Sequence, residues 1–391
     1  MILRRAVSAI LAAAVLTATP ALPQEGLHVI DVAGHEIAAA KPGTILRVWP
    51  QVGGAVGNAK AYRILYRSTG TNGEPIAVSG AVFIPDGPAP HGHRDVIAWA
   101  HPTTGVVDRC APTLLPDLAG TVAGLEEMMR RGFVVAATDY QGLGVKGIHP
   151  YLVGISEARS VIDSVRAARQ LPDALAGDRF AVWGHSQGGH AALFTGEEAP
   201  SYAPELKLVG IATAAPATYL VELFKADRGS VGGSTLTAMA LYSWSSIYDI
   251  PTDTVLAPGA KRSYEEVATT CMESIAEFLK LEQAAEPLQR RFLKADPTKI
   301  EPWRDIMLAN SPGHKPAGAP VFIAQGTADE TVRPQITRQF ADHLCAEGTP
   351  VVMKLLDGVS HVYAGYDSAN EAIAWMADRF RGAHPPSGCK Q

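Results

Sequence analysis

Residues 180–189 read FAVWGHSQGG, and this stretch decides the fold. Its first four residues are apolar, as in a buried strand, and residues 190–198 beyond the glycines are compatible with a helix. Between them, Gly184-His185-Ser186-Gln187-Gly188 matches the pattern G-x-S-x-G. Glycines on both sides of Ser186 permit a sharp turn, because they carry no Cβ. The stretch therefore predicts a strand–turn–helix unit that presents the Ser186 hydroxyl at a helix N-terminus.

Strands and helices alternate on both sides of this unit. The sequence predicts strands at residues 61–66, 76–84, 95–100, 133–138, 179–183, 208–214, 321–325 and 351–356, and helices at residues 114–131, 155–171, 190–198, 335–346 and 370–380. Such alternation predicts an α/β fold, in which a mostly parallel sheet has helices on both faces. The first two strands are expected to be joined by a turn at Gly70–Gly73.

One long segment interrupts the alternation. Residues 216–316 contain no clear strand pattern and are expected to form helices and loops. We therefore expect an α/β core at 59–215 and 317–391, with a helical cap or lid at 216–316 inserted before the strand at 321–325. Residues 22–58 are expected to form an irregular N-terminal extension.

The first residues have the pattern of an export signal. Arg4-Arg5 precedes the largely apolar run 6–18, and the small residues Thr19-Pro20-Ala21 offer a cleavage site after Ala21. Residues 1–21 are therefore expected to be a signal peptide, and the protein to be secreted, either to the extracellular space or to the periplasm. No later stretch reaches the roughly 18 apolar residues of a transmembrane helix.

Composition narrows the class of protein. Of 391 residues, 47% are hydrophobic and 19% are charged, which is a globular balance and excludes disorder over most of the chain. The formal net charge is −5, and loss of Arg4 and Arg5 with the signal peptide makes the chain more acidic. An acidic chain without basic clusters argues against a nucleic-acid partner.

Four cysteines, Cys110, Cys271, Cys345 and Cys389, indicate disulfides. An exported chain with an even number of cysteines favours two disulfides, for which three pairings are possible. We favour Cys110–Cys271 and Cys345–Cys389, because the second pair would fasten the tail rich in proline and glycine. No two cysteines lie within a few residues of each other, so their spacing does not indicate a metal site.

A serine hydroxyl becomes a useful nucleophile only beside a base that an acid orients. In the order typical of G-x-S-x-G proteins, the acid and then the histidine follow the serine. Asp329 follows the predicted strand 321–325, and His361 follows the strand 351–356. Because the carboxyl ends of parallel strands meet at one edge of a sheet, Ser186, Asp329 and His361 are expected to converge there.

Other acids and histidines compete for these roles. Glu330 and Asp357 lie near Asp329 and His361, but their turn positions fit less well, and Asp139 precedes Ser186 in the chain. Five other histidines compete with His361, and each is expected to have another role. His101 is expected to brace a loop, and His185 and His190 to have structural roles at the helix that follows Ser186. His343 lies in a predicted helix and His384 in the C-terminal tail.

Acyl transfer also requires donors for the oxyanion of the tetrahedral intermediate. The backbone N–H of Gln187, directly after the serine, is the first expected donor. The second is expected in the loop His101–Gly105, after the strand at 95–100. Pro102 has no N–H, so Thr103 is our first choice and Thr104 the second.

Several motifs together resemble the secretory lipase family of α/β-hydrolases, the group typified by fungal lipase A. They are AWAHPTTGVVDRCAP at 98–112, TDYQGLG at 138–144, GHSQGGH at 184–190, GTADETV at 326–332 and GVSHVY at 358–363. The resemblance runs from about Ala61 to the end of the chain. It implies an α/β-hydrolase fold, a helical cap, two disulfides and catalytic roles for Ser186, Asp329 and His361. Related sequences often have His-Gly where this chain has His101-Pro102, a difference at the predicted oxyanion loop.

These residues predict ester hydrolysis through an acyl-enzyme, without a metal or an organic cofactor. The resemblance implies a lipase, and a triacylglycerol lipase is our first expectation. The apolar cap segment Leu236–Trp244 could line an acyl pocket or edge a lid that contacts a lipid–water interface. Packing of the cap alone would also explain that segment. Alternatives are a short-chain carboxylesterase, an acyltransferase or an amidase with the same triad. A more distant one is a non-catalytic binding protein, although the chain retains all three triad residues.

Overall fold

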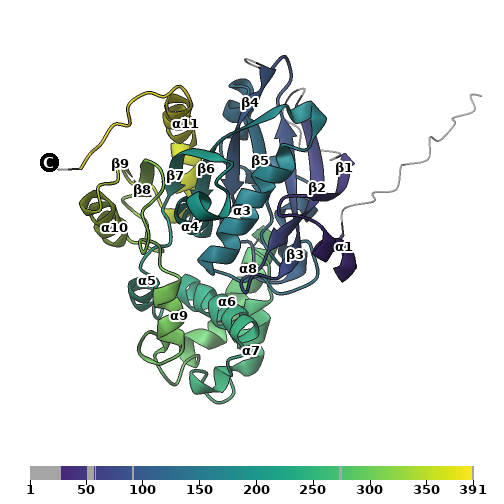
Figure 1. Cartoon of the computed structure of the whole chain (residues 1–391). Coiled ribbons are helices and arrows are strands. Elements are labelled where there is room, and N and C mark those ends of the chain that lie inside the picture. Colours follow the sequence, from purple (N-terminus) through teal and green to yellow (C-terminus); the bar gives the residue numbers. More distant parts are fainter. Residues whose placement is uncertain (1–27, 51–56, 58, 90–91, 273–274, 390–391) are drawn as a thin grey trace, which may run out of the picture.

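The computed structural model describes residues 28–50, 57, 59–89, 92–272 and 275–389, and one sheet forms its centre (Figure 1). The predicted signal peptide at 1–21 lies outside the described residues. Strands are arranged across the sheet in the order β1-β2-β3-β5-β4-β6-β7-β8-β9. The pairs β1–β2, β2–β3 and β3–β5 are antiparallel, and every other neighbouring pair is parallel. The predicted α/β class with a mostly parallel sheet is therefore confirmed.

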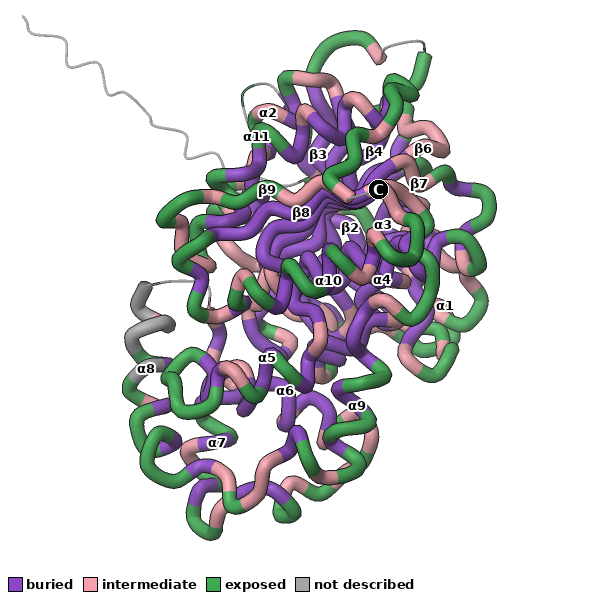
Figure 2. The backbone as a smooth tube through the Cα atoms, turned by 90° about the vertical axis from the view of Figure 1, so that its left-hand side faces the viewer, coloured by how far each residue is buried: buried purple, intermediate pink, exposed green. Residues whose placement is uncertain are grey.

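Every strand except β1 overlaps a predicted run. The strands are β1 (Ile45–Pro50), β2 (Lys60–Thr69), β3 (Pro75–Ile84), β4 (Arg94–Ala100), β5 (Val134–Thr138), β6 (Ala176–His185), β7 (Lys207–Ala214), β8 (Val321–Gly326) and β9 (Val351–Leu356). The central strands are buried along their length, which appears as purple tube in Figure 2. In β4, Ile97 and Trp99 pack on one face of the sheet, and Val96 and Ala98 pack on the other. Apolar side chains on both faces explain why these strands have continuous apolar sequences.

Helices cover both faces of the sheet. Helices α3 (Gly154–Ala168), α4 (Gln187–Tyr202) and α10 (Pro334–Ala346) pack on one face, and α2 (Leu125–Arg130) and α11 (His361–Phe380) pack on the other. Because β4, β6, β7, β8 and β9 are parallel, the loops that leave their carboxyl ends meet at one edge of the sheet.

A layer of helices lies at one end of the sheet, between β7 and β8 in the chain (Figure 1). It consists of α5 (Leu220–Ala226), α6 (Val231–Tyr248), α7 (Lys261–Ala268), α8 (Ile275–Arg290) and α9 (Trp303–Ala309). These helices fall inside the segment 216–316 that was expected to be helical, and we call them the cap. In the part of the chain that the structure describes, no helix is long and apolar enough to cross a membrane.

Both favoured disulfides are present. Cys110 and Cys271 are joined with an Sγ–Sγ distance of 2.06 Å, and Cys345 and Cys389 with 1.99 Å. The first disulfide links the loop after β4 to the cap. Beside it, the Met272 N–H donates to the Thr104 carbonyl at 2.8 Å. The cap is therefore fastened directly to the loop that contains Thr103.

Three local predictions were wrong. The segment 22–58 is not irregular throughout, since it contributes helix α1 (Gly34–Ala39) and the edge strand β1. That strand is mostly exposed or half-buried, so it lacks a clear apolar alternation. The expected helix at 114–131 is α-helical only at Leu125–Arg130, because Pro116, Gly120 and Gly124 interrupt its beginning. The final helix starts at His361 rather than at residue 370.

Candidate active site

Ser186 lies on a strained turn between β6 and α4. Its backbone has φ +58° and ψ −117°, a conformation that non-glycine residues rarely adopt. A Cβ at Gly184 would collide with the Gly188 carbonyl, and a Cβ at Gly188 would collide with the Ala100 carbonyl at the end of β4. Both glycines are therefore required for the turn, and they bring the start of α4 against the loop after β4.

The serine belongs to a continuous chain of hydrogen bonds. The Ser186 hydroxyl lies 2.8 Å from His361 Nε2, and His361 Nδ1 lies 2.8 Å from Asp329 Oδ2. A carboxylate can only accept, so Nδ1 of His361 carries the proton and donates a hydrogen bond to Asp329. Nε2 then has no proton and accepts from the serine hydroxyl. This is the protonation pattern in which a histidine can remove the serine proton. Three residues from the ends of β6, β8 and β9 are thus brought together, as their positions in the sequence predicted.

Asp329 is held firmly in a buried position. Its Oδ1 accepts the backbone N–H groups of Thr331 and Val332 at 2.9 and 2.8 Å. Its Oδ2 accepts from Gln325 Nε2 at 3.1 Å in addition to His361. These donors orient the carboxylate toward the imidazole and compensate for its burial. Gln325 could not be singled out from the sequence, because it lies within a buried strand without a motif of its own.

His185 contacts the backbone of His361 and helps to position it. Its Nε2–H donates to the His361 backbone carbonyl at 2.9 Å, and the two rings are 5.1 Å apart. Burial, and to a smaller extent the nearby His361, lower the pKa of His185 to about 3, so His185 is neutral at physiological pH. A neutral ring here fixes the first residue of α11 without placing a second positive charge beside the imidazole.

The competing residues lie in other environments. Glu330 and Asp357 are exposed. Asp139 is buried and accepts hydrogen bonds from Ser79 and Thr113, so it braces the loop after β5. The remaining histidines contact backbone carbonyls or are exposed: His101, His190, His343 and His384.

The expected oxyanion donors lie on two adjoining elements. Gln187 is the first residue of α4, so its N–H is among the free amides at that helix terminus. The loop with Thr103 leaves β4 where Gly188 packs against Ala100. The Thr103 hydroxyl lies 2.9 Å from the Tyr151 hydroxyl, and Tyr151 shares a pocket with Ser186 and Gln187.

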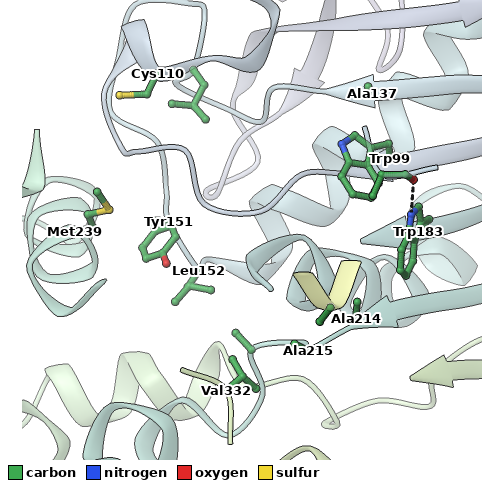
Figure 3. Packing of buried hydrophobic residues seen from close by; sticks show 14 of the residues in the cluster. Trp99, Cys110, Ala137, Tyr151, Leu152, Trp183, Ala214, Ala215, Met239 and Val332 are labelled. Atoms are coloured by element: carbon green, nitrogen blue, oxygen red, sulfur yellow. Dashed lines mark hydrogen bonds between the residues drawn. The ribbon is translucent and has the colours of Figure 1, made fainter. Parts of the chain in front are cut away.

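This pocket lies between the strand ends and the cap. Its volume is about 20 Å³, which holds little more than one water molecule. It is lined by Tyr151, Leu152, Ser186, Gln187, Ala217, Leu223, Phe224, Asp227, Gly233, Leu236, Thr237, Thr331 and Val332. Tyr151, Leu152 and Val332 belong to one apolar cluster with Met239 of α6 (Figure 3). The cap thus closes the pocket over the serine with mostly apolar side chains.

A buried polar network lies behind Gln187. Its Nε2 lies 2.8 Å from Glu157 Oε1 and 2.7 Å from His149 Nε2. Glu157 also accepts from His190 Nδ1 at 2.7 Å, and the other His190 nitrogen lies 2.8 Å from the carbonyl of Asn310, at the end of α9. Burial lowers the pKa of His149 to about 4, so its ring is neutral and Nε2 accepts from the glutamine. The network connects the cap to the start of α4.

One acidic residue of the pocket was not expected from the sequence. Asp227 follows α5, in a region where the sequence offers no motif, and its side chain is buried beside Ser186. Burial raises the pKa of Asp227 to about 7. No group of three or more His, Cys, Asp and Glu side chains within the described ranges is arranged to hold a metal ion.

Residues 121–388 match the model of the family described as "Secretory lipase". The chain belongs to the secretory lipase family. Among its relatives, Lipase A of Arthroderma benhamiae is 23% identical over 85% of this chain and 73% of that protein. The trichothecene C-3 esterase of Fusarium sporotrichioides is 24% identical over 88% of this chain and 81% of that protein. The resemblance carried by the five motifs is therefore confirmed.

A solved structure has the same fold as this chain. Candida antarctica lipase A in its closed state superposes with a TM-score of 0.76 and 19% identity, over 90% of this chain and 86% of that one. The fold is that of the α/β-hydrolases, and the protein is a carboxylic ester hydrolase.

Proposed function

We propose that this hydrolase cleaves esters with Ser186 as nucleophile, His361 as general base and Asp329 as the acid that orients the imidazole. The chain of two 2.8 Å hydrogen bonds from the serine to the buried carboxylate carries this proposal. The chain order serine, acid, histidine and the strained turn at Ser186 support it further.

The geometry supports a two-step reaction. Ser186 Oγ attacks the ester carbonyl while its proton moves to His361 Nε2, and Asp329 stabilises the resulting imidazolium. The oxyanion accepts hydrogen bonds from the backbone N–H groups of Gln187 and Thr103. His361 then protonates the leaving alcohol, which leaves an acyl group on Ser186. A water molecule, deprotonated by His361, attacks this acyl-enzyme and releases the carboxylic acid.

We propose that the substrates are lipid esters, with triacylglycerols as the favoured class. Leu223, Phe224 and Leu236 present apolar surface to the serine, as an acyl chain requires. A pocket of about 20 Å³ cannot hold even a short acyl chain, so the cap has to shift away from the strand ends when substrate enters. Residues 216–316 therefore act as a lid in this proposal.

Exposed apolar side chains support contact with a lipid surface. Val362 and Tyr363, directly after His361, are 65% and 61% exposed, and Tyr366 on the same helix is 52% exposed. The cap adds Val231 at the start of α6. Export through a signal peptide at residues 1–21 would bring this surface to lipids outside the cytoplasm. Membership in the secretory lipase family supports that part of the proposal.

Hydrolysis rates on p-nitrophenyl esters from acetate to palmitate test the proposal, together with labelling by a fluorophosphonate that reacts with active-site serines. Ser186→Ala should abolish labelling and lower kcat at least about a thousandfold. Ser201→Ala, which changes an exposed serine at the far end of the same helix, is the matched control and should retain both. Labelling or hydrolysis that persists in Ser186→Ala would overturn the nucleophile assignment. Good cleavage of long chains supports a lipase, whereas cleavage confined to the shortest chains makes the protein a carboxylesterase.

A further inference from the structure

The pocket over Ser186 contains a carboxyl group that the triad does not use. Asp227 follows the last residue of α5 and is 6% exposed. Its side chain lines the pocket together with Ser186, Gln187 and Tyr151. Among the described residues, its Oδ1 has no hydrogen-bond partner although the atom is buried. A buried carboxyl oxygen without a donor is costly, so its retention beside the nucleophile requires an explanation.

Local structure does not supply that explanation. The N-terminus of α6 is capped by Ser230, whose Oγ accepts the Gly233 N–H at 2.9 Å. The backbone carbonyl of Asp227, not its side chain, accepts from Ser230. The carboxyl group is therefore not needed to cap either helix.

The neighbouring cations are engaged elsewhere. Arg228 pairs with Asp296 at 2.9 Å, and Arg333 donates to the Ala226 carbonyl at 2.7 Å. Arg333 and His361 stabilise the charged form of Asp227 only at longer range, while Asp329 opposes it. Tyr151 is the other titratable group near the carboxyl, and its own pKa is raised by burial. Asp227 thus lines the volume in which the substrate must lie, and one oxygen of its carboxyl group has no partner.

We propose that Asp227 is a specificity residue that accepts a hydrogen bond from a hydroxyl group carried by the substrate close to its ester bond. This inference rests on the proposed ester hydrolysis. Within the lipid esters it favours hydroxylated ones, such as partial glycerides or esters of hydroxy acids, over triacylglycerols, which carry no hydroxyl group. A hydroxyl supplies the donor that Oδ1 lacks, whereas an unsubstituted hydrocarbon chain leaves it unpaired. A site built to bind a hydroxyl discriminates strongly against the analogue without it, for this reason.

Two pairs of nearly isosteric esters test the inference and locate the hydroxyl. Ethylene glycol monobutyrate against propyl butyrate places it on the alcohol, and ethyl β-hydroxybutyrate against ethyl isovalerate places it on the acyl group. Acid release is followed by titration at constant pH. We expect wild type to favour the hydroxylated member of one pair by about tenfold or more in kcat/KM. Asp227→Leu should bring that ratio close to one.

Two further variants keep the test decisive. Asp253→Leu, which changes an exposed acid of the cap, should keep the wild-type ratio. If Asp227→Leu does not fold, Asp227→Asn serves instead, because an amide oxygen is a weaker acceptor than a carboxylate and should lower the ratio.

The results separate this inference from the proposed function. A wild type that hydrolyses esters through Ser186 but prefers neither hydroxylated ester overturns the role of Asp227 alone. A preference that both Asp227 variants retain in full overturns it as well. If wild type hydrolyses no ester and is not labelled by the phosphonate, the proposed function fails, and the inference fails with it.

Discussion

The disulfide between Cys110 and Cys271 should control how readily the cap opens. It joins positions 161 residues apart. For a loop of that length, the chain-entropy relation predicts that the disulfide stabilises the folded protein by about 5 kcal/mol. Removing a native disulfide typically lowers the free energy of unfolding by about 2–5 kcal/mol. In Cys110→Ala/Cys271→Ala, the cap retains the hydrogen bond from Met272 to Thr104. If about 2 kcal/mol of the loss appears as easier cap opening, the open state becomes about 30-fold more populated.

Limited proteolysis with trypsin measures this opening. Lys261 and Arg262 are exposed on α7 and offer cleavage sites within the cap. Cleavage that samples the open state should accelerate by the same factor as the open population. The matched control is Cys345→Ala/Cys389→Ala, because that disulfide joins α10 to the C-terminal tail, outside the cap. Equal rates of cap cleavage in the two double variants would refute the reasoning.

Two further predictions concern the buried network behind Gln187. The pKa of His149 is about 4 in the folded protein and has its ordinary value of 6.5 in the unfolded chain. Between pH 4 and pH 6.5 the folded protein therefore binds fewer protons than the unfolded chain. The free energy of unfolding should thus fall by up to about 3 kcal/mol as the pH drops from 6.5 to 4, and urea titrations should show a shallower fall in His149→Gln. Glu157→Gln replaces one carboxylate oxygen by an amide NH2, so Gln187 or His190 loses its buried acceptor, and the free energy of unfolding should fall by about 1–3 kcal/mol. Glu205→Gln, at the exposed partner of Arg166, is its control and should lose under about 1 kcal/mol; an equal loss in the two variants counts against the buried pair.

Continuous apolar runs in the sequence predicted most of the sheet, because the central strands are buried on both faces. β9 at Val351–Leu356 matches its predicted bounds, and β4 and β8 differ from theirs by one residue at one end. The edge strand β1 was missed, since a half-exposed strand shows neither a continuous apolar run nor a clear alternation. The helix expected at 114–131 failed for a different reason: apolar residues at suitable spacing do not overcome Pro116 and Gly120.

The candidate triad was predictable because its residues follow recognisable strands. Ser186, Asp329 and His361 each follow the carboxyl end of a parallel strand. Those ends lie at one edge of the sheet, so the three residues meet there for any conformation of the loops between them. The side chains that complete the site lacked such a signal. His185 was expected to have a merely structural role, and its bond to the His361 carbonyl spans 176 positions of the chain. Contacts of that kind depend on how α11 packs, which no local pattern encodes.

The sequence by itself determined the α/β class, the strained turn at Ser186, the order of the triad and the chemistry of two disulfides. Each of these follows from residue types at short spacing or at the ends of strands, where local conformation limits the outcome. Only the tertiary structure decided that the cap closes the pocket to about 20 Å³ and that Asp227, with one unpaired carboxyl oxygen, lines it. Burial and hydrogen-bond partners depend on which distant segments pack together, and that arrangement results from the whole fold rather than from any one stretch of it.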